Sequence, residues 1–275
     1  MRFDFSKPGE VFVSMTKFTS EITEEYGIQG TADTPAATDL FDIDETSATL
    51  NNGEREKFHR TVAKCLYAVT RTRPDASLPV IFLTTRVLEP TQQDKDKLER
   101  VLRYFNGTHE LGIYLGLSQD GDLKLTCFAD ASHGVHSNGK SHSGIMISHG
   151  RGTILTKSAK QKIVCRSSTE SELVTLSDAI SLTAYELQFM QSLGIKMNQA
   201  QLMQDNTIRL AMNGKSCPDR TKHIKLSYYF IKQYLESGKF SITYCPTELM
   251  TADILTKPLQ GKLFRVMRNR LLGYE

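Results

Sequence analysis

The stretch LKLTCFADASHGVHSNGKSHSGIMISHGRGTILTKSAKQKIV, residues 123–164, decides the fold of the second half of the chain. Apolar and β-branched runs at 123–130, 143–148 and 152–164 are separated by polar segments rich in Gly, Ser, Asn and His. Such runs, bounded by turn residues, predict β-strands, and consecutive strands with short connections are expected to pair antiparallel. The stretch therefore predicts a three-stranded antiparallel sheet with Asp130 at the end of its first strand.

Helices and strands alternate after this sheet. Residues 169–193 carry an apolar stripe at helical spacing and are followed by Gly194, which predicts a long amphipathic helix. A strand, two helices, a strand and a terminal helix are expected next, at 200–205, 206–214, 223–236, 240–246 and from about 249. The order βββαβααβα predicts an α/β fold, in which helices flank a mixed five-stranded sheet.

The first half has a different pattern. We expect a strand at 10–15 and helices at 16–27, 56–87 and 91–107, of which the helical segment 56–87 is interrupted by Pro74 and Pro79. The segment 20–54 contains nine acidic and no basic residues, as expected of a linker. No group of residues in this half suggests chemistry. The sequence predicts two domains, a small mainly helical one over 1–117 with an acidic linker at about 20–54, and a sheet domain over 118–275.

Charge is divided unequally between these halves. Residues 1–117 contain 14 Lys and Arg against 18 Asp and Glu, whereas residues 118–275 contain 20 against 13. The basic second half suits a polyanionic partner, although a basic surface that is merely solvated would look the same. No apolar run approaches a membrane span and the first residues have no signal-peptide pattern, so we expect an intracellular, cytoplasmic protein without a membrane partner.

Acidic residues recur where elements of the second half begin or end. Asp130 and Asp205 each follow an apolar strand, Asp253 lies in LMTADILTKPL, and a glutamate lies near the start of the long helix. Each alone is explained by capping, which is common for aspartate. Carboxylates that converge from several elements would repel one another unless a cation held them, so together they indicate a hard-metal site.

Two glutamates compete for the helical position. Glu170 and Glu172 flank the apolar stripe of the helix on opposite sides. Each also completes a capping box, with Ser167 and Thr169 respectively. The residues alone leave the choice between them open, and a structural role remains an alternative for either.

Four histidines between residues 133 and 149 raise the alternative of a zinc site. They lie in a polar region with no cysteine or clustered acid at ligand spacing, which disfavours zinc: His133, His136, His142 and His149. The five cysteines are widely spaced and form no CxxC pair, so neither a disulfide framework nor a thiolate metal site is indicated.

Five blocks of the second half, taken with their order and spacing, carry a family resemblance. The blocks are CFADASHGVHSNGKSHSGIMI (127–147), KSAKQKIVCRSSTESELVTLSDA (157–179), MQDNTIRLAMN (203–213), RTKHIKLSYYFIKQYLESG (220–238) and YCPTELMTADILTKPLQG (244–261). They closely resemble the ribonuclease H domain of Copia/Ty1-type retrotransposon polyproteins. Upstream, 57–87 and 96–115 look like the end of the reverse transcriptase of the same elements. The resemblance implies a ribonuclease H-like sheet domain preceded by a thumb- or connection-like remnant.

This resemblance also implies an activity. The chain would be a metal-dependent endonuclease that hydrolyses the RNA strand of RNA–DNA hybrids with two Mg²⁺ ions, for which Mn²⁺ could substitute. The implied catalytic and metal-binding residues are Asp130, Glu172, Asp205 and Asp253. Glu172 is preferred to Glu170 because the glutamate of the family directly precedes a large apolar residue, here Leu173.

Three further positions matter under this resemblance. His223 falls at a position that the family keeps, where a catalytic role and a capping or phosphate-binding role are equally compatible. Many relatives carry a second acid at the position of Ser132. Many carry a histidine at the position of Tyr229, which weakens any histidine assignment in that helix.

Nucleic-acid binding would use basic and polar groups near the acids. The expected residues are Lys157, Lys160, Lys162, Arg166, Asn206 and Lys222. Binding through phosphates and 2′-hydroxyls should depend on salt and hardly on sequence. A terminal basic cluster (Lys257, Lys262, Arg265, Arg268 and Arg270) would either join this surface or form a solvated helix face. The expected partners are the hybrid and the rest of the polyprotein, in a virus-like particle if the element is active.

Three alternative functions can be compared with the sequence: DNA synthesis, hybrid binding without catalysis, and integrase or resolvase activity. It has no Asp-Asp dipeptide, so a polymerase active site is absent from this chain. A catalytically inactive hybrid-binding remnant of a decayed element is the main alternative. An integrase or resolvase of similar architecture is disfavoured by the order of the acids.

Overall fold

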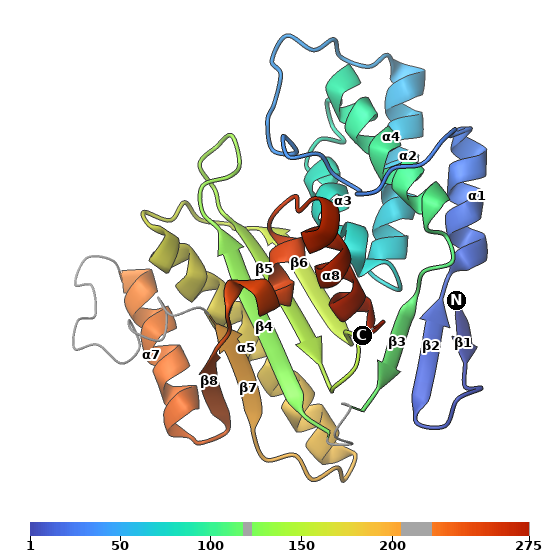
Figure 1. Cartoon of the computed structure of the whole chain (residues 1–275). Coiled ribbons are helices and arrows are strands. Elements are labelled where there is room, and N and C mark those ends of the chain that lie inside the picture. Colours follow the sequence, from blue (N-terminus) through green and yellow to red (C-terminus); the bar gives the residue numbers. More distant parts are fainter. Residues whose placement is uncertain (118–122, 205–221, 275) are drawn as a thin grey trace. The chain divides into compact units, whose positions relative to one another are not determined.

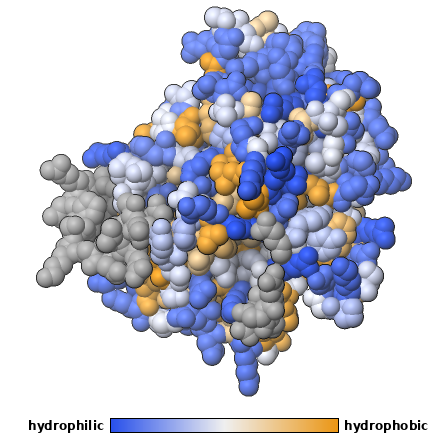
Figure 2. Space-filling model, in the orientation of Figure 1, coloured by the Kyte–Doolittle hydropathy of each residue, from blue (hydrophilic) through white to orange (hydrophobic). Residues whose placement is uncertain are grey.

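The computed structural model describes residues 1–117, 123–204 and 222–274, and the side chains of 222–225 lie outside the described set. The chain divides into two compact units: residues 1–115 with 257–275, and residues 116–256 (Figure 1). On the face drawn in Figure 2, hydrophilic side chains predominate and hydrophobic ones form small separate groups. Among the described residues, no helix is long and apolar enough to cross a membrane.

A five-stranded mixed sheet forms the centre of the second unit. Its strands lie in the order β6-β5-β4-β7-β8, with bounds Leu155–Lys160, His142–Ser148, Leu125–Ser132, Ala200–Gln204 and Phe240–Tyr244. The pairs β4–β5 and β5–β6 are antiparallel, whereas β4–β7 and β7–β8 are parallel. Helices α5 (Ser168–Ser192) and α7 (Lys222–Glu236) accompany it (Figure 1). The predicted mixed sheet with flanking helices is confirmed.

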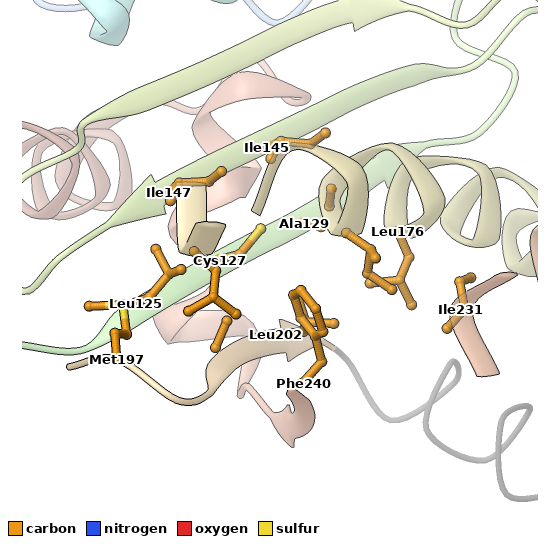
Figure 3. Close-up of a cluster of buried hydrophobic side chains, with 14 of the residues drawn as sticks. Leu125, Cys127, Ala129, Ile145, Ile147, Leu176, Met197, Leu202, Ile231 and Phe240 are labelled. Carbon is orange, nitrogen blue, oxygen red and sulfur yellow. The ribbon is translucent and has the colours of Figure 1, made fainter. Parts of the chain in front are cut away.

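Alternation along β4 sends its side chains to two different cores. Leu125, Cys127 and Ala129 face α5 and pack with Ile145 and Leu176, and Figure 3 shows this cluster gathered beside the sheet. The intervening residues face the opposite side of the sheet, where Phe128 packs against a smaller buried cluster that includes Met250. This two-residue period places Asp130 on the face away from α5.

Short 3₁₀ turns cover that opposite face. These are η2 (Thr247–Leu249) and η3 (Thr251–Leu255). The terminal helix predicted to begin at about residue 249 does not begin there. A regular helix, α8 (Gly261–Leu272), begins only after Pro258, because proline disfavours helical backbone in the residue before it. Residue 144 of β5 must be glycine to admit η3: a Cβ there would lie 2.6 Å from Cγ2 of Thr256 and 2.9 Å from the Ala252 carbonyl oxygen.

The first unit combines helices with a small sheet. Strands β1 (Arg2–Asp4), β2 (Glu10–Ser14) and β3 (Ile113–Gly116) form a three-stranded sheet in this order. The helices are α1 (Thr16–Tyr26), α2 (Asn52–Val69), α3 (Ser77–Thr84) and α4 (Gln92–Gly107), with the 3₁₀ turn η1 (Pro74–Ala76). The interruption predicted at Pro74 is present, because Pro74 begins η1 between α2 and α3. The interruption predicted at Pro79 is wrong, because Pro79 lies within α3. Strands β1 and β3 were not predicted, because each is too short to show a clear alternation.

The terminal helix α8 packs within the first unit. The sequence had predicted a single domain over all of 118–275, so the boundary at its C-terminal end differs. The ring of Phe264 meets the ring of Tyr104 edge to face, with centroids 5.7 Å apart. The Gln260 side-chain amide donates to the Ala36 carbonyl oxygen at 2.9 Å, and the Tyr274 hydroxyl accepts from the Gly112 amide at 3.2 Å. The sequence showed the apolar stripe of this helix but not which core would bury it.

Candidate active site at the end of strand β4

Asp130 begins a row of directly paired residues that crosses three strands. Asp130 of β4 is opposite Gly144 of β5, and Gly144 is opposite Ser158 of β6. All three face the 3₁₀ segment η3. Asp130 is partly buried, and its Oδ2 accepts a hydrogen bond from the Thr256 hydroxyl. The row therefore forms the floor on which the end of η3 rests.

Two serines, one on the edge strand β6 and one on the central strand β4, fix the same end of η3. Ser158 of β6 donates its hydroxyl to the Leu255 carbonyl oxygen at 2.8 Å, and Ser132 of β4 donates to the Thr256 carbonyl oxygen at 2.9 Å. The side chain of Asp253, within η3, is 4% exposed. Asp253 is thus held close to the end of β4, two and three residues before the carbonyls that the serines bind.

Ser132 has a structural use at a position where many members of the resembled family carry an acid. Its hydroxyl donates a hydrogen bond to a backbone carbonyl, which an ionised carboxylate cannot do. The serine therefore contributes to holding η3 and adds no charge to the site.

The structure separates the two competing glutamates of α5. Oε1 of Glu172 accepts from the Ala131 backbone amide at 3.1 Å, which brings its carboxylate to the end of β4 beside Asp130. Glu170 instead turns back to accept from the Arg166 amide at 2.7 Å, while its own amide donates to the Ser167 hydroxyl. Glu170 thus serves the helix start, whereas Glu172 lies next to the other acid.

Side chains also hold the two peptide groups that flank Asp130. The β4–β7 ladder ends at the pair Phe128 and Met203. Beyond it, the Gln204 side-chain amide donates to the Ala129 carbonyl oxygen at 2.8 Å, and Glu172 accepts from the Ala131 amide. The backbone around Asp130 is therefore fixed on both sides, although regular pairing with β7 has ended.

Several predicted site residues cannot be placed. Asp205 and Asn206 lie outside the described residues, and His223 and Lys222 lie in α7 with their side chains outside the described set. Within 1–117, 123–204 and 222–274, no group of three or more His, Cys, Asp or Glu side chains is arranged to hold a metal ion. The described acids alone thus do not form a complete metal site.

The predicted nucleic-acid-binding residues differ in their surroundings. Lys162 and Arg166 are exposed on the segment that joins β6 to α5. Lys157 forms an ion pair with Asp178 at 2.7 Å, and Lys160 is partly buried on β6 opposite His142. Of the terminal basic cluster, Lys262, Arg265, Arg268 and Arg270 belong to α8 in the first unit. Lys162 and Arg166 are therefore exposed cations that lie shortly before Glu172 in the sequence.

Two of the four histidines form a buried chain. Nε2 of His136 lies 3.0 Å from Nδ1 of His142, and Nε2 of His142 lies 2.8 Å from the Ser158 hydroxyl. Ser158, Gly144 and Thr256 were not among the residues predicted from the sequence to form the site. Only Gly144, a glycine inside an apolar strand, carried a usable signal, since such glycines mark close approach of another backbone.

Comparisons with known proteins point to one group. No family model matches the chain. It is 30% identical to the retrovirus-related Pol polyprotein from transposon RE1 of Arabidopsis thaliana over 78% of the chain, and 32% identical to that from transposon RE2 over 75%. The chain spans only 15% and 14% of these two polyproteins. An uncharacterized mitochondrial protein of the same plant is 33% identical over 66% of the chain and 72% of its own length.

Solved structures give more distant likenesses. Ribonuclease H1 from Halobacterium salinarum covers 48% of the chain at 16% identity, with a TM-score of 0.38. LC11 ribonuclease H1 in complex with an RNA/DNA hybrid covers 48% at 18% identity, with a TM-score of 0.37. The foamy viral protease-reverse transcriptase covers 90% at 11% identity, with a TM-score of 0.48. These TM-scores are low, and the curated relatives are the stronger finding.

Proposed function

Because the chain belongs to the Copia/Ty1-type retrovirus-related Pol polyproteins, we propose that its second unit is a ribonuclease H. Its substrate would be the RNA strand of an RNA–DNA hybrid. One observation carries the proposal: Asp130, Glu172 and the segment of Asp253 come together at the end of β4 through hydrogen bonds. These are three of the four acids that the sequence singled out.

The donor set fits a hard divalent cation. Carboxylate oxygens are the ligands that Mg²⁺ prefers, and Mn²⁺ accepts the same ligands. Asp130, Glu172 and Asp253 would hold the metal together with Asp205, which follows Gln204 in the sequence at the end of β7, the parallel neighbour of β4. When bound, two such ions would activate a water molecule and stabilise the leaving 3′-oxygen.

The residues of the chain would orient these acids and hold the substrate. The Thr256 hydroxyl fixes one oxygen of Asp130, and the Ala131 amide fixes one oxygen of Glu172. Lys162 and Arg166, exposed before α5, would bind phosphates of the hybrid. The first unit would be the thumb- or connection-like part of the reverse transcriptase that helps to position the duplex.

Cleavage of a labelled RNA–DNA hybrid in Mg²⁺ at low salt tests the proposal. The unmodified chain should cut the RNA strand and leave single-stranded RNA intact, whereas Asp130→Asn and Asp205→Asn should lose cutting by about a thousandfold, the scale expected when an electrostatic group of an active site is removed. Glu236→Gln is the control, because this exposed acid at the end of α7 pairs with Lys232, and neither residue is among the predicted site residues. Equal cutting by all variants would contradict the proposal.

A noncatalytic role in hybrid binding is the second candidate. It is supported by the exposed cations Lys162 and Arg166 before α5, which could bind phosphates without any cleavage. The same hybrid separates the two functions. Binding that weakens with salt, without cleavage in Mg²⁺ or Mn²⁺, would support the binding role and refute the nuclease.

A further inference from the structure

Two histidine side chains are buried beside the candidate site and are not among its proposed metal ligands. His136 lies in the connection between β4 and β5 and is 5% exposed, whereas His142 begins β5 and is fully buried. Their rings approach with centroids 5.3 Å apart and share the 3.0 Å contact from Nε2 of His136 to Nδ1 of His142. Burying a polar side chain such as histidine costs free energy unless its polar atoms form hydrogen bonds.

The direction of the hydrogen bonds follows from Ser158. Its hydroxyl has one proton, which it donates to the Leu255 carbonyl oxygen, so toward His142 it acts as an acceptor. His142 must then carry its proton on Nε2 and accept at Nδ1 from the Nε2 proton of His136. The three side chains form one directed chain from the β4–β5 connection, through β5 and β6, to the backbone of η3.

This chain ends two residues after Asp253. The 3₁₀ segment η3 has only five residues, so its position depends on what holds its end. Without the Ser158 hydroxyl, the Leu255 carbonyl oxygen would lose its hydrogen bond to β6. Without His142, the Ser158 hydroxyl would lose the donor that fixes its orientation.

We propose that His142 and Ser158 are positioning residues that hold η3, and with it Asp253, in place for metal binding. This inference rests on the proposed function, because it assigns Asp253 a metal to bind. Neither residue would touch the substrate. Their effect would pass through the backbone of residues 253–256.

Matched serine variants test the inference in the full chain. Ser158→Ala removes the link and Ser158→Thr keeps a hydroxyl. Ser148→Ala is the control, because Ser148 is also a buried serine of this sheet whose hydroxyl donates to a backbone carbonyl, that of Gly152 at 2.5 Å. His142→Phe removes the donor to Ser158 while leaving an apolar ring in its place.

Two readouts other than cleavage are measured. Hydrogen exchange of a peptide covering 251–256 should speed up roughly fivefold in Ser158→Ala and in His142→Phe, as expected for one lost hydrogen bond. Binding of Mn²⁺, followed by electron paramagnetic resonance, should weaken by about tenfold or more in the same two variants, as is usual when a residue supporting metal ligands is lost. Ser158→Thr and Ser148→Ala should keep both properties near those of the unmodified chain.

The outcomes separate this inference from the proposed function. Unchanged exchange at 251–256 in Ser158→Ala, or an equal change in Ser148→Ala, would overturn the inference while cleavage by the unmodified chain still stood. Faster exchange with unchanged Mn²⁺ binding would also overturn it. If the unmodified chain neither binds Mn²⁺ nor cuts the hybrid, the proposed function fails and the inference falls with it. Faster exchange and weaker Mn²⁺ binding, with rescue by Ser158→Thr, support it even where hybrid cleavage is too slow to measure.

Discussion

Thr256 donates its hydroxyl proton to Oδ2 of Asp130, although 126 residues separate the two in the sequence. The same hydroxyl lies 3.3 Å from the Asp253 carbonyl oxygen. One small side chain thus joins the strand that carries the first acid to the segment that carries the last. Its position within the sequence TADILT gave no indication of this link.

Replacing Thr256 by Val should impair the proposed nuclease with little change in shape. The variant loses the donor to a carboxylate, a hydrogen bond of the stronger kind, so we expect the rate of hybrid cleavage to fall by about tenfold or more. Thr256→Ser keeps the hydroxyl and should retain most of the activity. Cleavage rates at saturating Mg²⁺ measure the effect, and equal rates for the Val and Ser variants would contradict it.

Replacing Gly144 by Ala should destabilise the second unit. The new Cβ would lie 2.6 Å from Cγ2 of Thr256 and 2.9 Å from the Ala252 carbonyl oxygen, so η3 would have to move. Overpacking of this kind costs about 1–3 kcal/mol of unfolding free energy. Gly53→Ala is the control, since a Cβ there meets nothing closer than 3.6 Å. Urea unfolding compares the two, and equal stability would show that η3 yields easily.

The two glutamates of α5 should respond differently to the same substitution. Glu172→Gln should abolish hybrid cleavage, because it removes a proposed metal ligand. Glu170→Gln should leave cleavage within a few fold and cost about 1 kcal/mol of stability, since its carboxylate accepts from the Arg166 amide at the helix start. Single-turnover cleavage and thermal unfolding of both variants provide the measurements. Loss of cleavage in Glu170→Gln alone would reverse the assignment.

Stability should decline in mild acid because of the buried histidines. Burial, reinforced by the neighbouring imidazole and by Lys160, lowers the pKa of His142 to about 3, and burial with the Lys160 charge lowers that of His136 to about 4. In the unfolded chain both would titrate near 6.5. Their contribution to stability is therefore complete above about pH 6.5 and is lost as the pH falls toward 4, by up to roughly 1.4 kcal/mol per pH unit for each histidine.

Urea unfolding at pH 7, 6 and 5 measures this decline. His142→Phe should flatten it relative to the unmodified chain, whereas replacing the exposed His59 by Gln should leave it as it is. A decline that His142→Phe does not alter would show that other groups cause the acid sensitivity.

Local sequence signals predicted much of the second unit. The run of apolar and β-branched residues at 123–130 predicted β4 with Asp130 near its end, and Gly194 follows α5 as expected. The sequence could not show that η3 packs on Gly144 or that Ser158 binds the Leu255 carbonyl. These contacts join residues far apart in the chain, and no periodicity encodes them.

In the first half, too, features set by neighbouring residues could be predicted, whereas contacts between distant residues could not. A Thr91 cap begins α4, with its hydroxyl accepting from the Asp94 amide, and Gly27 ends α1 in the left-handed conformation. Both are decided by residues within a few positions of each other. The destination of α8 was missed because it depends on a distant partner, the ring of Tyr104.

The return of the chain to its first unit makes the second unit a topological insertion. The segment 116–256 is continuous, with both of its ends joined to the same unit. It could therefore be cut out as a single piece, whereas the first unit could be produced alone only by ligating residue 115 to residue 257. A premature stop anywhere between these two junctions would also remove α8 and leave the aromatic face of Tyr104 without its partner.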